Sequence, residues 1–118
     1  MCARPKTREY RPVVSSASAL DAFAEATDWL LADPGDDPRR SLSGATPYLK
    51  AMGLLTGGWM MAKSANIAAK NAGDGDFYRA KLATARFYAA NLLPQVSAHT
   101  KAATAGPDDI MALADAAF

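Results

Sequence analysis

Apolar and polar residues recur at helical spacing along most of this chain, and the longest such stretch runs from Gly44 to Gly73. No charged residue occurs between Lys50 and Lys63 within it. Apolar residues lie on all sides of the helix that this stretch would form. Such a distribution indicates burial on several sides, so we expect other helices to surround it.

Both ends of this long helix carry recognisable boundary residues. Thr46 is a good N-cap, and Pro47 suits the first helical position, where its missing N–H group is not needed. Gly73 suits the position just after the C-cap. The pattern therefore predicts a helix that begins at Thr46 and ends before Gly73.

Three glycines interrupt the apolar interior of this helix at positions 53, 57 and 58. Each glycine costs about 1 kcal/mol relative to alanine in a helix interior. We expect them to allow close approach of another backbone, or to make room for a ring such as that of Phe87 or Tyr88. A local bend at Gly57 and Gly58 is the alternative interpretation.

Two further helical patterns flank the long one. A first helix is predicted from Ser16 to Ala32, with its apolar face formed by Leu20, Phe23, Thr27, Leu30 and Leu31. A third helix is predicted to follow with Asp74 or Asp76 as its cap, and to be kinked at Pro94, because proline removes one backbone hydrogen bond. The short turn 74–76 would join the second and third helices as an antiparallel hairpin.

The two chain ends are predicted to differ from each other. Pro5 and Pro12 indicate an irregular lead-in over residues 1–14, whereas residues 15–118 would form one helical domain. After Gly106 and Pro107, a last helix is predicted from Asp108 onward. The predicted fold class is therefore all-α, a four-helix bundle-like up-down domain with a long central helical hairpin.

Composition narrows the class of protein without pointing to an activity. The chain has 118 residues, 50% of them hydrophobic, and a formal net charge of +1, which gives no reason to expect a nucleic-acid partner. The uncharged run over 51–62 is shorter than the about 20 apolar residues of a transmembrane helix. The single cysteine, Cys2, allows no intramolecular disulfide, and we expect a cytoplasmic protein.

Residues that could carry chemistry are scattered. His99 is the single histidine, and the aspartate clusters lie at turns and helix starts, where capping accounts for them. The sequence contains neither a nucleophile motif nor a glycine-rich phosphate loop. We therefore expect no catalytic, cofactor-binding or metal-binding residue in this chain.

The ordered set of segments around the central hairpin nevertheless resembles a known family. It is similar to the extra C-terminal helical domain of FAD-dependent acyl-CoA dehydrogenases, in the 3-methylmercaptopropionyl-CoA dehydrogenase-like branch. The likeness extends from about Val14 onward. It is carried by Gly44–Leu49, Gly53–Ala62, Lys81–Tyr88, Leu92–Pro94 and Ala112–Phe118.

The resemblance implies an accessory role in an oxidoreductase of fatty acid metabolism. FAD and the catalytic glutamate of that family would lie in domains other than these 118 residues, and catalytic domains or a second copy would be the partner. Two alternatives stay open: a stand-alone module that binds an acyl or CoA ligand, with Arg39, Arg40 or Lys50 at the phosphates, or a homodimeric structural module. The candidate interface and packing residues are Tyr48, Gly53, Gly57, Gly58, Trp59, Phe87 and Tyr88.

Overall fold

The computed structural model describes residues 11–32 and 35–117, and these form helices and loops without strands. The helices are α1 (Arg11–Leu31), α2 (Arg39–Lys70), α3 (Asp76–Asn91), α4 (Gln95–Ala103) and a short 3₁₀-helix, η1 (Asp115–Ala117). The predicted all-α class with a long central hairpin is confirmed.

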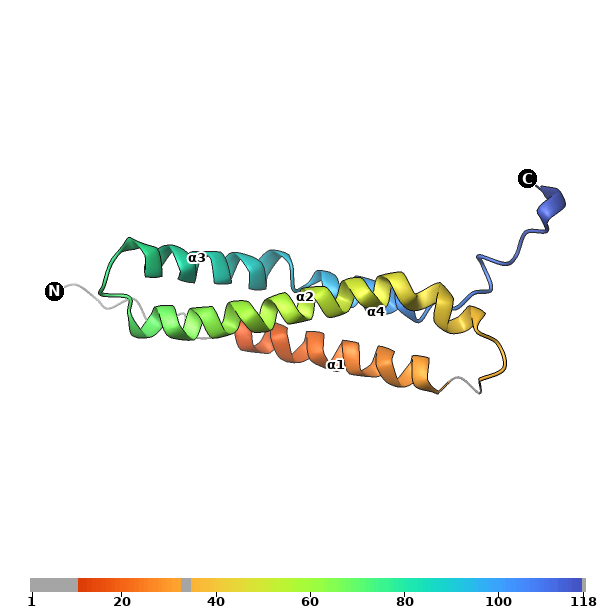
Figure 1. Ribbon diagram of the computed structural model, residues 1–118, viewed down its shortest axis with the longest axis horizontal. Coiled ribbons are helices and arrows are strands. Elements are labelled where there is room, and N and C mark those ends of the chain that lie inside the picture. Colours follow the sequence, from red (N-terminus) through yellow and green to blue (C-terminus); the bar gives the residue numbers. More distant parts are fainter. Residues whose placement is uncertain (1–10, 33–34, 118) are drawn as a thin grey trace.

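Helix α2 is the axis of the fold (Figure 1). α3 runs back along its C-terminal half, and α4 continues along its N-terminal half, where α1 also packs. The molecule is elongated, with extents of 73 × 30 × 24 Å. After α4 the chain leaves the bundle and extends away from it (Figure 1).

The core of the bundle is small and rich in alanine. Its centre is formed by Ala19 of α1, Ala51 of α2, and Leu93 and Val96 around the start of α4. Val96 is the largest side chain that is fully buried. Because alanine side chains are short, they let the helix backbones approach closely, but they bury little apolar surface.

Helix α2 begins at Arg39, so the predicted start at Thr46 is wrong. Pro47 lies inside the helix, where it removes the one backbone hydrogen bond that the carbonyl of Ser43 would accept. Packing compensates for that loss, since Gly44 is buried directly against Ala103 at the end of α4. The helix ends at Lys70 with Asn71 as the C-cap, three residues short of Gly73.

Helix α1 begins at Arg11, whereas a start at Ser16 was expected. Pro12 lies in the first turn, where a proline costs the helix no hydrogen bond. The irregular lead-in was predicted for residues 1–14, but the chain is helical from Arg11 onward. Residues 1–10 lie outside the described residues, and the domain boundary at residue 15 stays a prediction.

The predicted apolar face of α1 is correct only in part. Phe23, Thr27 and Leu30 are half-buried, but Leu20 and Leu31 are exposed. The most buried positions are instead Ala19 and Ala26. The spacing of large apolar residues did not predict these buried positions, because helices in close contact bury small side chains such as alanine at the contact.

The predicted interruption at Pro94 is confirmed. α3 ends at Asn91, and the amides of Leu92 and Leu93 both donate to the carbonyl of Tyr88 before α4 begins at Gln95. Proline has no amide to donate at this junction. The break lets α4 follow a separate path, which places it against both α1 and α2.

A last helix from Asp108 does not form, and that prediction is wrong. Residues 107–110 make a turn, and only the three residues of η1 are helical further on. Ile110, Met111 and Leu113 are all exposed. A short helix without a packing partner is not stable in water, so the apolar spacing of this segment is insufficient on its own.

Candidate interaction surface

Tyr48 joins α2 to α1 inside the bundle. Its ring stacks on that of Phe23, with centroids 4.7 Å apart and planes 19° from parallel. The hydroxyl of Thr27 donates to the Phe23 carbonyl at 2.8 Å, so the Tyr48 hydroxyl donates to Thr27 Oγ1, also at 2.8 Å. Tyr48 is therefore a packing residue of this chain and is not free to meet a partner through its hydroxyl.

Gly57 provides space for the ring of Tyr88. A Cβ atom at Gly57 would collide with the Tyr88 hydroxyl and would lie 2.9 Å from Cζ. That hydroxyl donates to the carbonyl of Leu54 at 2.8 Å. Burial raises the pKa of the Tyr88 phenol, because the charged form is poorly solvated there.

Replacing Tyr88 with phenylalanine should lower the free energy of unfolding by about 1 kcal/mol, the usual net value of one hydrogen bond. The raised pKa means that this contribution is full below the ordinary tyrosine pKa of 10.0 and is lost as pH rises through the folded-state value. Urea unfolding at neutral and at strongly alkaline pH measures both effects. The matched variant Tyr78→Phe should show a smaller loss at neutral pH; an equal loss would contradict the assignment.

Gly58 accommodates the side chain of Leu93 in the same way. A Cβ atom at Gly58 would lie 2.6 Å from Leu93 Cδ2 and 3.2 Å from Cγ. Leu93 is itself buried in the core. Three of the four glycines of α2 thus serve contacts within the chain: Gly44 with a backbone, Gly57 with a ring and Gly58 with an aliphatic side chain.

Gly53 differs from the other three, because a Cβ atom there would meet nothing within 4 Å. It belongs to a largely apolar surface along α2 that no other helix covers. We call this surface the outer face of α2. Its members are Leu42, Thr46, Leu49, Met52, Gly53, Thr56, Trp59, Met60, Lys63 and Ile67, all of them exposed.

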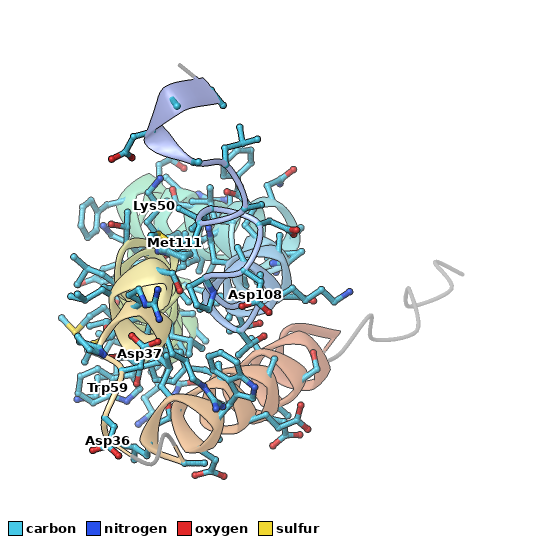
Figure 2. All side chains as sticks on the ribbon, turned by 90° about the vertical axis from the view of Figure 1, so that its right-hand side faces the viewer. Asp36, Asp37, Lys50, Trp59, Asp108 and Met111 are labelled. Atoms are coloured by element: carbon cyan, nitrogen blue, oxygen red, sulfur yellow. The ribbon has the colours of Figure 1, made fainter. Side chains whose placement is uncertain are left out.

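Trp59 is the largest side chain of the outer face. It is 58% exposed, and the ammonium nitrogen of Lys63 lies 3.7 Å from its ring centroid. In Figure 2 its side chain points away from α4. The expected packing of other helices around α2 is found for α1, α3 and α4, but the outer face of α2 stays open in this chain.

A second exposed apolar group lies on α3. Phe77 and Phe87 are each at least 60% exposed. Near the hairpin turn, Phe77 shares a shallow depression of about 150 Å³ with Ile67 and Lys81. The outer face of α2 and the exposed side of α3 thus meet at that end of the hairpin.

The overall dimensions reflect both the elongated bundle and the segment after α4 that leaves it (Figure 1). The radius of gyration is 19.7 Å, whereas a compact domain of this length has about 13 Å. The accessible surface is 9047 Å², against about 6,100 Å² for a compact chain of this mass. Contiguous exposed apolar surface of this kind is typical of protein–protein contact sites.

The three cationic residues considered for phosphate binding do not form one site: two have partners within the chain, and the third lies away from them. Arg39 forms a bidentate ion pair with Asp37, whose pKa is lowered to about 2 by side-chain and backbone hydrogen bonds from Arg39. Arg40 stacks over the Trp29 ring at 3.8 Å and donates to its carbonyl. Lys50 lies apart from Asp37 in Figure 2, so the three cations do not converge.

Chemistry-bearing groups do not gather within residues 11–32 and 35–117. No group of three or more His, Cys, Asp or Glu residues there could hold a metal ion. A depression of about 200 Å³ between α1 and the start of α4, lined by Ala19, Ala22 and Leu93 among others, is smaller than the roughly 300–1,000 Å³ of small-molecule sites. Among the described helices, none is long and apolar enough to cross a bilayer.

Comparison with known proteins gives consistent matches. A family model described as "Acetyl-CoA dehydrogenase C-terminal like" matches residues 3–114. The 3-methylmercaptopropionyl-CoA dehydrogenase of Ruegeria pomeroyi is 38% identical over 98 residues, which cover 80% of this chain and 17% of that protein. The broad-specificity linear acyl-CoA dehydrogenase FadE5 of Mycobacterium tuberculosis is 37% identical over 81 residues, covering 64% and 13%.

This chain therefore spans less than a fifth of the length of these two curated relatives. No solved structure matches it.

Proposed function

This chain belongs to the acetyl-CoA dehydrogenase C-terminal-like family, and on that premise we propose that it is a non-catalytic accessory domain. It packs against the flavin-dependent catalytic domains of an acyl-CoA dehydrogenase and contributes to their oligomerisation. Those domains would carry out α,β-dehydrogenation of an acyl-CoA thioester. The observation that carries the proposal is the uncovered apolar surface of α2 and α3.

The described residues do not fit FAD or an acyl-CoA. The depression between α1 and α4 has about 200 Å³, and Arg39 and Arg40 are engaged within the chain. The space that Gly57 and Gly58 leave beside α2 is filled by Tyr88 and Leu93. Redox chemistry is therefore assigned to other domains, and this chain supplies contact surface.

We assign the contact with the catalytic domains to the exposed side of α3. Phe77 and Phe87 lie about 15 Å apart along α3 and about 80° apart around its axis, and both rings are largely exposed. Aromatic side chains of this kind contribute strongly to protein interfaces, because they bury a large area and lose few rotamers. The depression beside Phe77 gives that side a concave end at which a partner side chain could insert.

The test uses the purified chain with the flavin-containing catalytic domains of the Ruegeria relative. The chain alone should show no flavin absorbance and no acyl-CoA-dependent reduction of a dye acceptor. It should bind the catalytic domains, and Phe87→Glu should weaken that binding at least tenfold. Arg86→Ala, on another side of α3, is the control. Dehydrogenase activity of the chain alone, or absence of binding, would contradict the proposal.

A further inference from the structure

The outer face of α2 has the spacing of a coiled-coil seam. Steps of four and three residues alternate along one row of exposed positions, which consists of Leu42, Thr46, Leu49, Gly53, Thr56, Met60, Lys63 and Ile67. A row of this period keeps one stripe of a helix facing a partner helix over many turns. From Leu42 to Ile67 the row is about 37 Å long at 1.5 Å per residue.

The row is also symmetric about its own middle. If the helix is paired with an antiparallel copy of itself around a point between positions 54 and 55, Leu42 lies opposite Ile67 and Leu49 lies opposite Met60. Gly53 then lies opposite Thr56 at the centre. Large apolar residues meet towards both ends, and small residues meet in the middle, where the two backbones come closest. A two-fold symmetric interface requires this self-complementarity.

Met52 and Trp59 flank the row on one side. In this register the position directly opposite Met52 is Gly57, and Trp59 of the second copy lies two residues, about 3 Å, further along the axis. A thioether beside an aromatic ring is a favourable contact.

Within the row, Lys63 is placed opposite Thr46, and the two Lys63 side chains stay about 25 Å apart along the axis. Residues 42–70 contain no acidic side chain, so the pairing brings no carboxylate into the seam. The Lys63 ammonium group lies over the Trp59 ring of its own chain.

We propose that α2 pairs antiparallel with α2 of a second copy of this chain, with the two-fold axis beside Gly53 and Thr56. The inference deepens the oligomerisation role and rests on the proposed function for its biological purpose. The pairing also explains why glycine stands at position 53, where a Cβ atom would meet nothing within the single chain. Ile67 lies in this pairing and also lines the depression beside Phe77, whereas Phe87, about 15 Å further along α3, stays available to the catalytic domains.

The exposed area is of the size that a stable dimer needs. The large apolar side chains of the outer face are between 50% and 68% exposed. These six side chains are Leu42, Leu49, Met52, Trp59, Met60 and Ile67. If each buries on the order of 100 Å², together they supply about 600 Å² per copy, without the flanking atoms. A standard interface buries about 800 Å² per partner. The face also forms a continuous strip, which allows the area to be buried together.

Disulfide cross-linking tests the register directly. In a Cys2→Ser background, Leu49→Cys/Met60→Cys should form intermolecular disulfides under mild oxidation. The two positions are about 16 Å apart within one helix, beyond the reach of an intramolecular disulfide. The matched pair Leu42→Cys/Met60→Cys, shifted by about two turns, should not cross-link. Neither should Leu49→Cys alone, which would cross-link in a parallel pairing.

Sedimentation of the whole chain tests the association itself. The unsubstituted chain should form a dimer, and Leu49→Glu should raise the dimer dissociation constant at least tenfold while leaving the helix content unchanged. Ala62→Glu, exposed half a turn away from the seam, is the control. A monomer at all concentrations, or cross-linking in the shifted or single-cysteine variant, would overturn the inference.

Failure of this inference can be told apart from failure of the proposed function. A monomeric chain that still binds the catalytic domains overturns the self-pairing and leaves the accessory role intact. Binding of those domains that is lost in Leu49→Glu and kept in Phe87→Glu assigns the outer face to them, and also overturns the self-pairing. A cross-linked dimer that binds no catalytic domain supports the self-pairing and contradicts the accessory role.

Discussion

Replacing Gly44 with valine is expected to lower the free energy of unfolding by about 3 kcal/mol, the upper part of the range for overpacking a core. Gly44 is buried in α2 against the end of α4. A Cβ atom there would collide with the carbonyl oxygen of Ala103 and lie 3.2 Å from the carbonyl carbon. The obstruction is backbone, which cannot rotate away, so the two helices must separate.

The sign of the change in unfolding free energy for Gly44→Val shows whether tertiary packing or intrinsic helix propensity dominates at this position. Valine is a better helix former than glycine by a few tenths of a kcal/mol, so propensity alone predicts a small gain in stability. The control is Ala45→Val, at the exposed neighbouring position, where a change below about 0.5 kcal/mol is expected. Urea unfolding followed by circular dichroism measures both. If the two variants are equally stable, the close contact between α2 and α4 is not present in solution.

This contact also shows where reading the sequence was insufficient. Thr46 and Pro47 are good local start signals, and they predicted a helix that begins seven residues after its true start. The helix instead begins at Arg39, whose amide donates to the Asp37 carboxylate, and it runs through Gly44, which fits against Ala103 far away in the sequence. Contacts of that kind override local preferences, and a single sequence does not reveal them.

Periodicity was sufficient for the parts that depend on a long, repeated signal. The all-α class, the antiparallel hairpin of α2 and α3, and the break at Pro94 all follow from apolar spacing and proline chemistry. Apolar spacing did not predict the structure of a segment whose helix would form only if another helix covered it. The segment after Asp108 has helical spacing but no partner, and it stays irregular with Ile110 exposed.

The aromatic candidate residues fall into two groups, those that pack within the bundle and those that are exposed, and residue type alone did not predict which is which. Tyr48 and Tyr88 carry hydroxyl groups and hold the bundle together through them. Trp59 and Phe87 are largely exposed. Because an aromatic ring at helical spacing suits both a core and an interface, only the positions of the neighbouring helices distinguish the two.

Replacing Leu93 with alanine is expected to lower the free energy of unfolding by about 3 kcal/mol, because a buried leucine leaves a cavity. The loss should be partly restored by a second substitution, Gly58→Ala. In the unsubstituted chain a Cβ atom at Gly58 would lie 2.6 Å from Leu93 Cδ2, so Gly58→Ala alone should be neutral or destabilising. Once Leu93 is shortened, the same change gains about 1 kcal/mol of helix propensity.

The two substitutions should therefore couple by about 1–2 kcal/mol, as residues in direct contact do. Gly53→Ala is the control for the cycle, since its Cβ atom would meet nothing in the chain and its effect should be the same with Leu93 or Ala at position 93. Chemical unfolding of the six chains gives both coupling energies. Equal coupling for Gly58 and Gly53 would mean that the glycines lower helix propensity without fitting a neighbour, and the packing of α2 against the start of α4 would have to be reassigned.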